Sequence, residues 1–419
     1  MTAVAYAALW LFVFSVPWER VIVITDVAIV TRATGALALG LALLAVIISG
    51  RFRRWRPFHL LALMFVLCAG VGVMTLGLPV IPKKFWTYTQ LLLVLWMIWE
   101  LAVSRKRVTG LFVAYVLGAY VAAIATIMVY VTQGGSLRRF AAAGGDPNDL
   151  AMTIALALPM AWYLGMTLRQ PLVRWICRGF LPIGLLVLGL TGSRGGMLAG
   201  LVGMLIVPLS MTRLSPGRLA TGIVMLVLSG TLAVYLVPEQ TVERLATTGQ
   251  EVEDLSLGGR FKLWRAGLIA FVEKPILGYG TSGFKTAVTP QLGIRAQVAH
   301  NSFLSVLVEQ GLLGFVLYTA MFLSVFWAVL RLPRPERRFA LVLLGTLTVT
   351  MLPLTWEDQK QVWFVMAALV GLAAAPDLMF AGAPAQTSRP YQPYRAGSPA
   401  MASRPREPWT GRPVGRYRP

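Results

Sequence analysis

The chain has 419 residues, of which 57% are hydrophobic and only 13% are charged, and its mean hydropathy is +0.69. These values lie outside the range of soluble globular domains and predict a protein that crosses a membrane many times. A formal net charge of +21 suggests nucleic-acid binding, but the cations lie in alternate loops between apolar segments, a pattern of membrane topology that excludes it.

Apolar segments recur from end to end, and most are long enough to cross the ~30 Å hydrocarbon core of a bilayer. We therefore predict an all-α polytopic membrane protein with about twelve transmembrane helices. The predicted spans are 3–17, 33–50, 58–79, 86–104, 109–131, 149–168, 178–192, 196–212, 219–237, 301–330, 339–355 and 362–380. This divides the chain into helices 1–9 (1–237), a loop domain (238–300), helices 10–12 (301–380) and a tail (381–419).

The charges of the loops fix the predicted orientation. With the N-terminus in the cytoplasm, the most strongly basic loops all fall on the cytoplasmic side, as the positive-inside rule requires. These loops are 51–56, 104–107, 168–178, 212–218 and 331–338, and together with the tail they hold most of the 38 Lys and Arg residues. Both termini are therefore predicted to be cytoplasmic. The tail mixes Pro, Gly, Ser and Arg with few aliphatic residues, which predicts disorder.

The loop domain 238–300 is the one long excursion on the outer side. Its first part is too polar to lie in lipid, and its second part contains RFKLWRAGLIAFVEKP (260–275). The apolar positions in that stretch predict short amphipathic helices at the membrane interface. These positions are Phe261, Leu263, Trp264, Leu268 and Phe271.

Several outer arginines are candidates for binding an anion, since the planar guanidinium can bind two phosphate oxygens at once. Arg194 stands in GSRGG (192–196), where glycines could let backbone amides form a concave nest. Arg260 and Arg265 are five residues apart and would face one site if Arg260 belonged to the helix cap. Further candidates are Arg138, Arg139, Lys83 and Lys84. The alternative is that these are ordinary interfacial or ion-paired surface residues.

His300 is the candidate general base. Asn301 and Ser302 are good N-cap residues, so His300 is expected just before the first turn of the helix 301–330. The positive end of that helix would disfavour the imidazolium and keep the ring able to accept a proton near pH 7. A neutral imidazole suits the deprotonation of a sugar hydroxyl. A histidine that only caps an interfacial helix is the alternative for His300, and His59 is predicted to be an interfacial residue only.

Glu309 lies inside the same predicted span, where a carboxylate is costly to bury. Nine residues separate it from His300, which places the two on opposite sides of an ideal helix. We therefore predict that Glu309 is a structural partner for an arginine or for an amide at a helix end, and that it does not orient the imidazole.

Several common catalytic signatures do not occur in the sequence. There is no phosphate-binding loop, no dinucleotide-binding glycine pattern, no HExxH and no cluster with metal-ligand spacing. No metal or cofactor is therefore predicted. If the protein is a transferase that uses no metal, we expect its donor to be activated by a lipid carrier outside the cytoplasm. Arginine would then stabilise the leaving group.

Together, these motifs resemble the O-antigen ligase/polymerase superfamily. SRGG (193–196) and GGDPNDLA (144–151) are similar to recurrent patches of that family, and a longer signature follows. It consists of Arg260 and Trp264, then Pro275, Gly278 and Gly280, then His300-Asn301, Leu304, Glu309, Gly311 and Gly314.

The resemblance implies an activity, partners and a location. Lipopolysaccharide O-antigen ligases transfer a glycan from undecaprenyl diphosphate to lipid A-core at the periplasmic face of the bacterial inner membrane. By similarity, His300 would activate the acceptor hydroxyl for inverting attack without a metal. Arg194, Arg260 and Arg265 would bind the diphosphate, with Arg138 and Arg139 as additional candidates. The expected partners are the carrier-linked glycan, lipid A-core and membrane lipids, and no nucleic acid.

Four other functions stay open. O-antigen polymerases and protein O-oligosaccharyltransferases belong to the same superfamily, but the outer loop at 132–148 is short and only a tail follows the last span. These two features favour the ligase. A twelve-span transporter would be expected to show two similar halves with binding residues near the bilayer midplane. The sequence shows no such similarity, and its distinctive polar residues cluster on one face. A purely structural membrane scaffold would not need a cationic loop beside a histidine.

Overall fold

The computed structural model describes residues 1–21, 29–75, 81–133, 139–142, 145–211, 259–293 and 296–375, with the single residues 217, 220, 223, 224, 227 and 231. Within these residues all regular structure is helical and there is no strand, which confirms the all-α prediction for this part of the chain. Most of the predicted span 219–237, the polar part of the loop domain up to residue 258, Arg138 and the tail lie outside the described residues.

The helices of the described residues occur in the following order along the chain. They are α1 (Thr2–Ser15), the 3-10 helix η1 (Val16–Trp18), α2 (Ile29–Ser49), α3 (Pro57–Thr75), α4 (Lys83–Leu101), α5 (Arg105–Gln133), α6 (Pro147–Thr167), α7 (Pro171–Thr191), α8 (Arg194–Met204), α9 (Ile206–Met211), α13 (Arg260–Glu273), α14 (Phe284–Leu292), α15 (Ser302–Leu330), α16 (Arg334–Met351) and α17 (Lys360–Ala374).

Six of these helices, α2, α3, α5, α6, α7 and α15, contain segments long and apolar enough to cross a membrane. Shorter apolar stretches coincide with α1, with α8 and α9, and with α17. The chain is therefore a helical membrane protein, while the total of twelve spans stays a prediction.

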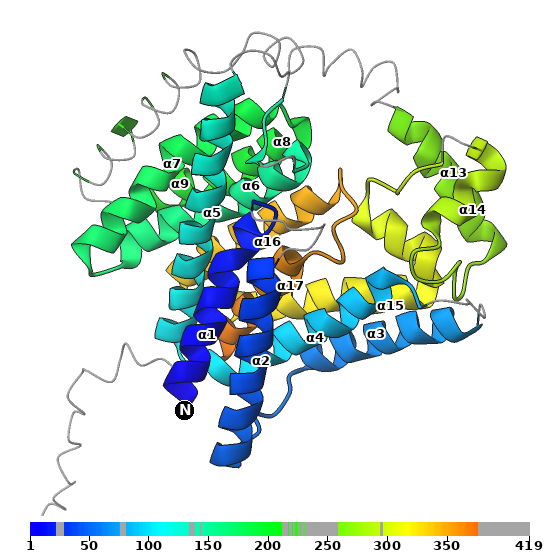
Figure 1. Ribbon diagram of the computed structural model, residues 1–419, viewed down its shortest axis with the longest axis horizontal. Helices are drawn as coiled ribbons and strands as arrows, with labels where there is room; N and C mark the ends of the chain where they lie inside the picture. Colours follow the sequence, from blue (N-terminus) through cyan, green and yellow to red (C-terminus); the bar gives the residue numbers. More distant parts are fainter. Residues whose placement is uncertain are drawn as a thin grey trace, which may run out of the picture. The chain divides into compact units, whose positions relative to one another are not determined.

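Burial separates a central helix from those that face lipid. Every residue of α6 from 151 to 162 is buried, and α6 contacts α5, α7, α8 and α16 (Figure 1). On α2, by contrast, Ile47 and Ile48 are 74% and 61% exposed. Large apolar side chains on the outside of a bundle are stable only where hydrocarbon covers them, so α2 presents a lipid-facing surface.

Two ion pairs each join loops that the charge pattern assigns to the same side of the membrane. Arg20, which follows η1, forms an ion pair of 2.6 Å with Asp149 at the start of α6. At the opposite ends, Arg105 of α5 pairs with Glu336 of α16 at 3.3 Å. The first pair joins two loops predicted to be outer, and the second joins two predicted to be inner.

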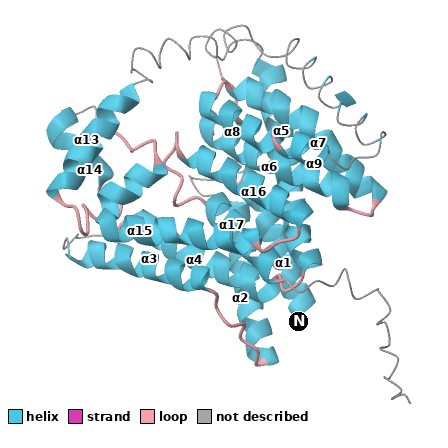
Figure 2. Cartoon of the chain, turned by 180° about the vertical axis from the view of Figure 1, so that it is seen from behind, coloured by secondary structure: helices cyan, strands magenta, loops and turns pink. Residues whose placement is uncertain are grey.

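The helices α13 and α14 form a module with its own small core, beside one end of α15 (Figure 2). The predicted helix at 260–275 is confirmed as α13, but its buried face differs from the predicted one. Leu263, Ala266 and Ala270 are buried, whereas Leu268 is 53% exposed. The small residues of α13 allow close contact with α14, as at Gly267, where a Cβ would meet Phe284, while Leu268, Ile269 and Val272 are exposed.

The helix α15 is broken at Gly311, and the module is attached there. Gly311 has φ 63° and ψ −165°, a conformation essentially restricted to glycine. The break frees backbone groups of α15, and the segment after α13 satisfies them. The Leu312 amide donates to the Pro275 carbonyl (2.7 Å), and the Tyr279 amide donates to the Val308 carbonyl (2.9 Å). The position of the module on α15 is thus set by main-chain hydrogen bonds.

Gly311→Ala is expected to lower the free energy of unfolding by at least about 2 kcal/mol. A Cβ atom at this position would collide with the Ile276 carbonyl oxygen, in addition to the strained φ. The measurement is thermal unfolding in detergent. Gly40→Ala is the matched control because a Cβ there meets no atom within 4 Å, so its melting temperature should not fall. Equal melting of Gly311→Ala and the wild type would contradict the role of the break.

Candidate active site

The turn that carries His300 is tied to the loop between α16 and α17. The His300 amide donates to Thr355 Oγ1 at 3.0 Å. The Ser302 hydroxyl donates to the Leu354 carbonyl and accepts from the Trp356 amide, both at 2.8 Å. Three hydrogen bonds therefore fix the entry into α15, so the position of His300 is defined by two segments far apart in the sequence.

The location predicted for His300 is confirmed. Asn301 is the N-cap of α15, and its side chain accepts from the Leu304 amide at 3.0 Å. His300 itself has φ 46°, and Ser282 is the only other non-glycine residue with positive φ among those described. Such backbone conformations are uncommon outside glycine and often occur at functional sites. Both residues lie where the α13–α14 module meets the rest of the protein.

Arg260 is close enough to His300 for its positive charge to affect the imidazole. The indole of Trp264 helps to hold α13, which carries Arg260, near the histidine. Trp264 Nε1 donates to the Ala299 carbonyl at 3.0 Å, which ties α13 to the residue before His300. Arg260 is the first residue of α13, after the N-cap Gly259, so it lies one turn from Trp264. Arg265 is exposed, and among the described contacts none joins it to His300. The structure thus brings Arg260, and not Arg265, to the histidine.

Burial lowers the pKa of His300, and the positive charge of Arg260 lowers it further, while Asp146 and Asp149 raise it to a smaller extent. We predicted a neutral imidazole because of the α15 dipole. The causes that the structure identifies are desolvation first and Arg260 second. A pKa below the ordinary value of about 6.5 leaves the ring unprotonated at neutral pH.

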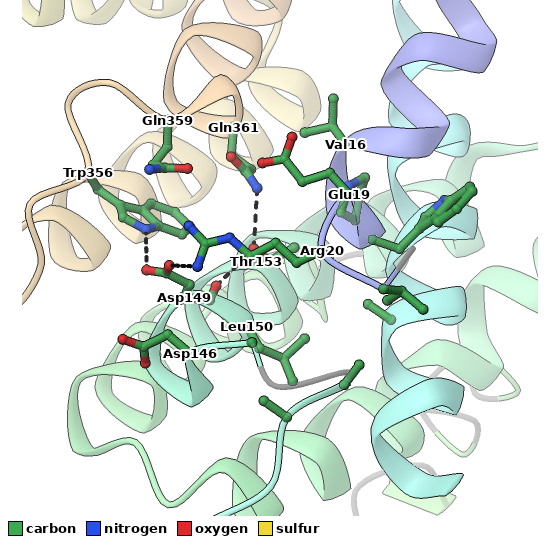
Figure 3. Close-up of a pocket in the computed structure, with 17 residues that line it drawn as sticks. Val16, Glu19, Arg20, Asp146, Asp149, Leu150, Thr153, Trp356, Gln359 and Gln361 are labelled. Atoms are coloured by element: carbon green, nitrogen blue, oxygen red, sulfur yellow. Dashed lines mark hydrogen bonds and ion pairs between the residues drawn. The ribbon is translucent and has the colours of Figure 1, made fainter. Parts of the chain in front are cut away.

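The two aspartates lie at the start of α6, beside a small cavity of about 50 Å³ (Figure 3). Asp146 caps α6 by accepting from the Asn148 amide at 2.7 Å. Asp149 is held between the Arg20 guanidinium and Trp356 Nε1, at 2.6 and 2.9 Å (Figure 3). The aspartates are therefore negative charges held in fixed positions near His300. The loop that contains Trp356 contacts both Asp149 and the His300 amide.

The turn between α7 and α8 carries Arg194 on this same face. Arg194 is the first residue of α8. Asn148 Oδ1 accepts from Ser193 Oγ at 3.0 Å and from Arg139 Nη2 at 2.7 Å. Arg139 Nε also donates to the Thr191 carbonyl at 2.9 Å. Arg139 thus connects the start of α6 to the end of α7, which supports the turn that presents Arg194.

The glycines around Arg194 serve close helix contact. A Cβ on Gly195 would meet the Pro353 side chain, and one on Gly196 would meet Ala151 Cβ. The Gly196 amide donates to Ser193 Oγ at 3.2 Å, so it does not point into an open anion nest. The predicted nest is therefore wrong for this amide. The small residues let α8 approach α6 and the loop before α17.

Lys84 lies in a buried ionic cluster next to this face. Its Nζ contacts Glu309 Oε2 at 2.8 Å and Glu357 Oε1 at 2.5 Å, with side-chain exposures of 10%, 4% and 0%. Glu309 also accepts from the Ser282 amide at 3.0 Å. The prediction of a helix-end amide as a partner for Glu309 agrees with Ser282, which precedes α14, but its cation is a lysine and not an arginine. Lys84 is thus committed to carboxylates.

The electrostatics of this face favour an anion. The helices α6, α8 and α15 all begin here, with the N-caps Asp146, Ser193 and Asn301. Each helix N-terminus carries a partial positive charge of roughly half a unit, which attracts phosphate groups. Arg194 and Arg260 add full charges beside these helix ends.

The fold and the site define a class: a polytopic helical membrane protein with a neutral histidine and arginines on one face. Residues 179–319 match the family model described as O-antigen ligase. The matched segment contains Arg194, Arg260 and His300. The segment 179–319, about a third of the chain, is thus similar to the O-antigen ligase family, which confirms the resemblance seen in the sequence.

A protein of Haemophilus influenzae, described only as uncharacterized, is also similar to this chain. The two are 26% identical over 157 residues, which amount to 33% of this chain and 39% of the relative. The chain therefore spans about two fifths of the length of that relative, and the similarity carries no further function.

Apart from Glu309, the acidic residues of the site were assigned no role from the sequence. Asp146 precedes Pro147, a combination typical of a helix start, so its capping role could have been predicted. For Asp149 and Glu357 no local signal exists, because their partners Arg20 and Lys84 are more than a hundred residues away.

His300 is expected to titrate with a pKa below 6.5 when its ring signals are followed by NMR. The assignment is simple because the chain has only two histidines. Arg260→Gln should raise that pKa because it removes a repelling positive charge. Asp146→Asn is the opposite control and should lower it. An unchanged pKa in Arg260→Gln would contradict the proximity of the two side chains.

Proposed function

We propose that the protein is an O-antigen ligase, a glycosyltransferase that moves a glycan from undecaprenyl diphosphate to lipid A-core. The observation that carries the proposal is the juxtaposition of a neutral His300 with Arg260, on a face where three helix N-termini meet. A base that is free of its proton and a set of positive charges are the two requirements of inverting transfer from a diphosphate. We assign this face to the periplasm of the bacterial inner membrane, and both termini to the cytoplasm, from the charges of the loops.

In the proposed reaction, the His300 ring takes the proton of an acceptor sugar hydroxyl. The oxygen attacks the anomeric carbon of the donor, the new glycosidic bond forms, and the bond from that carbon to the phosphate oxygen breaks with inversion. The electron pair leaves with undecaprenyl diphosphate. The proton on His300 then passes to water or to the departing diphosphate, which restores the neutral ring.

Arg194 and Arg260 are assigned to the diphosphate, since both lie at the N-termini of helices on the proposed periplasmic face. Arg265 is included through the family resemblance, and its exposed position on α13 suits a more peripheral phosphate contact. Arg139 is assigned a positioning role, because two of its guanidinium nitrogens already hold Thr191 and Asn148. Arg138 stays a candidate from the sequence.

His300→Asn is expected to reduce glycan transfer at least about a hundredfold, which is the lower range for general base catalysis. Asparagine tolerates positive φ, so the backbone at this position should be kept. The measurement is transfer from carrier-linked glycan by purified protein, with lipid A-core or a second carrier-linked unit as the acceptor. Extension of lipid A-core identifies a ligase, whereas extension of the carrier-linked unit identifies a polymerase.

His59→Asn is the control for this experiment because it changes the other histidine, which lies at the start of α3 among the inner loops. It should keep the wild-type transfer rate. Normal transfer by His300→Asn, with an unchanged melting temperature, would remove the assignment of the base.

Arg194→Gln and Arg260→Gln are each expected to weaken binding of undecaprenyl diphosphate by about tenfold or more, since each removes a charge-assisted hydrogen bond. Binding is measured by titration of the purified protein. Lys262→Gln, an exposed residue of the same helix α13, is the matched control and should bind normally. Unchanged affinity in both arginine variants would exclude the proposed diphosphate site, and the loss in Arg265→Gln shows whether that arginine takes part.

A further inference from the structure

A second cavity lies at the other ends of the helices, away from His300. It has a volume of about 340 Å³ and is lined by the start of α3 and by the last turns of α15 and α17. The loops on this side are the strongly basic ones at 51–56 and 331–338. The cavity is therefore on the face that the charge distribution assigns to the cytoplasm.

Two arginines mark the rim of this cavity. Arg56 immediately precedes α3, and Arg331 is the C-cap of α15. Within the described part of the chain, neither guanidinium forms an ion pair or a hydrogen bond, and both residues are exposed. Arg105 on the same face differs, because Glu336 neutralises it at 3.3 Å. The cavity thus has two positive charges without a carboxylate partner among the described residues.

The helix ends around the cavity contribute opposing partial charges. The N-terminus of α3 is positive, whereas the C-termini of α15 and α17 are negative. These contributions offset one another in part, so the preference for an anion depends on the two guanidinium groups.

The remaining wall is apolar and suits hydrocarbon. Trp327 is 62% exposed, and Phe58, Ala328 and Val370 line the interior. A tryptophan beside arginines is typical of the level where the acyl chains meet the headgroups. Ser324 is the other polar lining residue, and its hydroxyl donates to the Met321 carbonyl at 2.7 Å.

We propose that this cavity binds an anionic phospholipid of the cytoplasmic leaflet, with the phosphodiester between Arg56 and Arg331 and an acyl chain along Trp327. Basic pockets between transmembrane helices are suited to such headgroups. A zwitterionic lipid fits less well, because its ammonium group would meet the two arginines. The proposal concerns the opposite face from His300, so it stands or falls independently of the glycosyltransferase assignment.

The test is a titration of the full-length detergent-purified protein with phosphatidylglycerol, followed by native mass spectrometry. Phosphatidylcholine with the same acyl chains and inorganic phosphate are run in parallel. Phosphatidylglycerol should bind, phosphatidylcholine should bind at least about tenfold more weakly, and inorganic phosphate should not displace the bound lipid. Equal binding of both lipids would overturn the proposal, and displacement by phosphate would show a simple anion site instead.

The double variant Arg56→Gln and Arg331→Gln should lose the preference for phosphatidylglycerol. Its matched control is Arg54→Gln with Arg334→Gln, which removes two exposed arginines of the same loops that do not line the cavity. If the first double variant does not fold, photoactivatable phosphatidylglycerol is crosslinked to the wild type. Crosslinks within 324–331 support the site, and their absence there contradicts it.

Discussion

The arrangement of the site depends on one junction, where the broken helix α15 meets the segment that follows α13. Gly311 opens the helix, and backbone groups of residues 275–279 close the gap with hydrogen bonds. Two residues before the break, the Glu309 carboxylate accepts hydrogen bonds from the Ser282 amide and from the Lys84 ammonium group. The helix that begins beside His300 and the module that carries Arg260 are thus joined by a buried, charged contact. Neither could move far without exposing unpaired polar groups in a low-dielectric region.

This junction explains how a site of few residues is held with precision at a membrane surface. Burying a charge costs free energy unless the charge is paired with good geometry. Removing one partner leaves the other as an unpaired buried charge, which destabilises the fold. Lys84 faces two carboxylates, so it links α4, α15 and the loop before α17 in a single contact. The same loop binds the amide of His300 through Thr355 and holds Asp149 through Trp356. The histidine and its neighbouring charges therefore share one support.

Patterns that are local in the sequence predicted most of the fold, and long-range contacts supplied the rest. The apolar segments predicted the membrane-crossing helices of the described residues and their order. Capping residues placed His300 before α15 correctly. The partner of Glu309 could not be found in this way, because Lys84 is more than two hundred residues distant. The nest at Gly196 was wrong because the packing of α8 on α6, which only the tertiary structure defines, uses that glycine.

Because the junction is formed by main-chain hydrogen bonds, its side chains are free to differ between related proteins. Carbonyl and amide groups hold the segment 275–279, so many side chains there can be exchanged without changing the attachment. The exceptions are Gly278 and Gly311, where any Cβ would collide with backbone atoms of the opposite segment. In related chains, the glycines at these positions should therefore be kept while most other residues of the segment vary. Common ancestry would then be visible in short, widely separated motifs rather than in overall sequence identity.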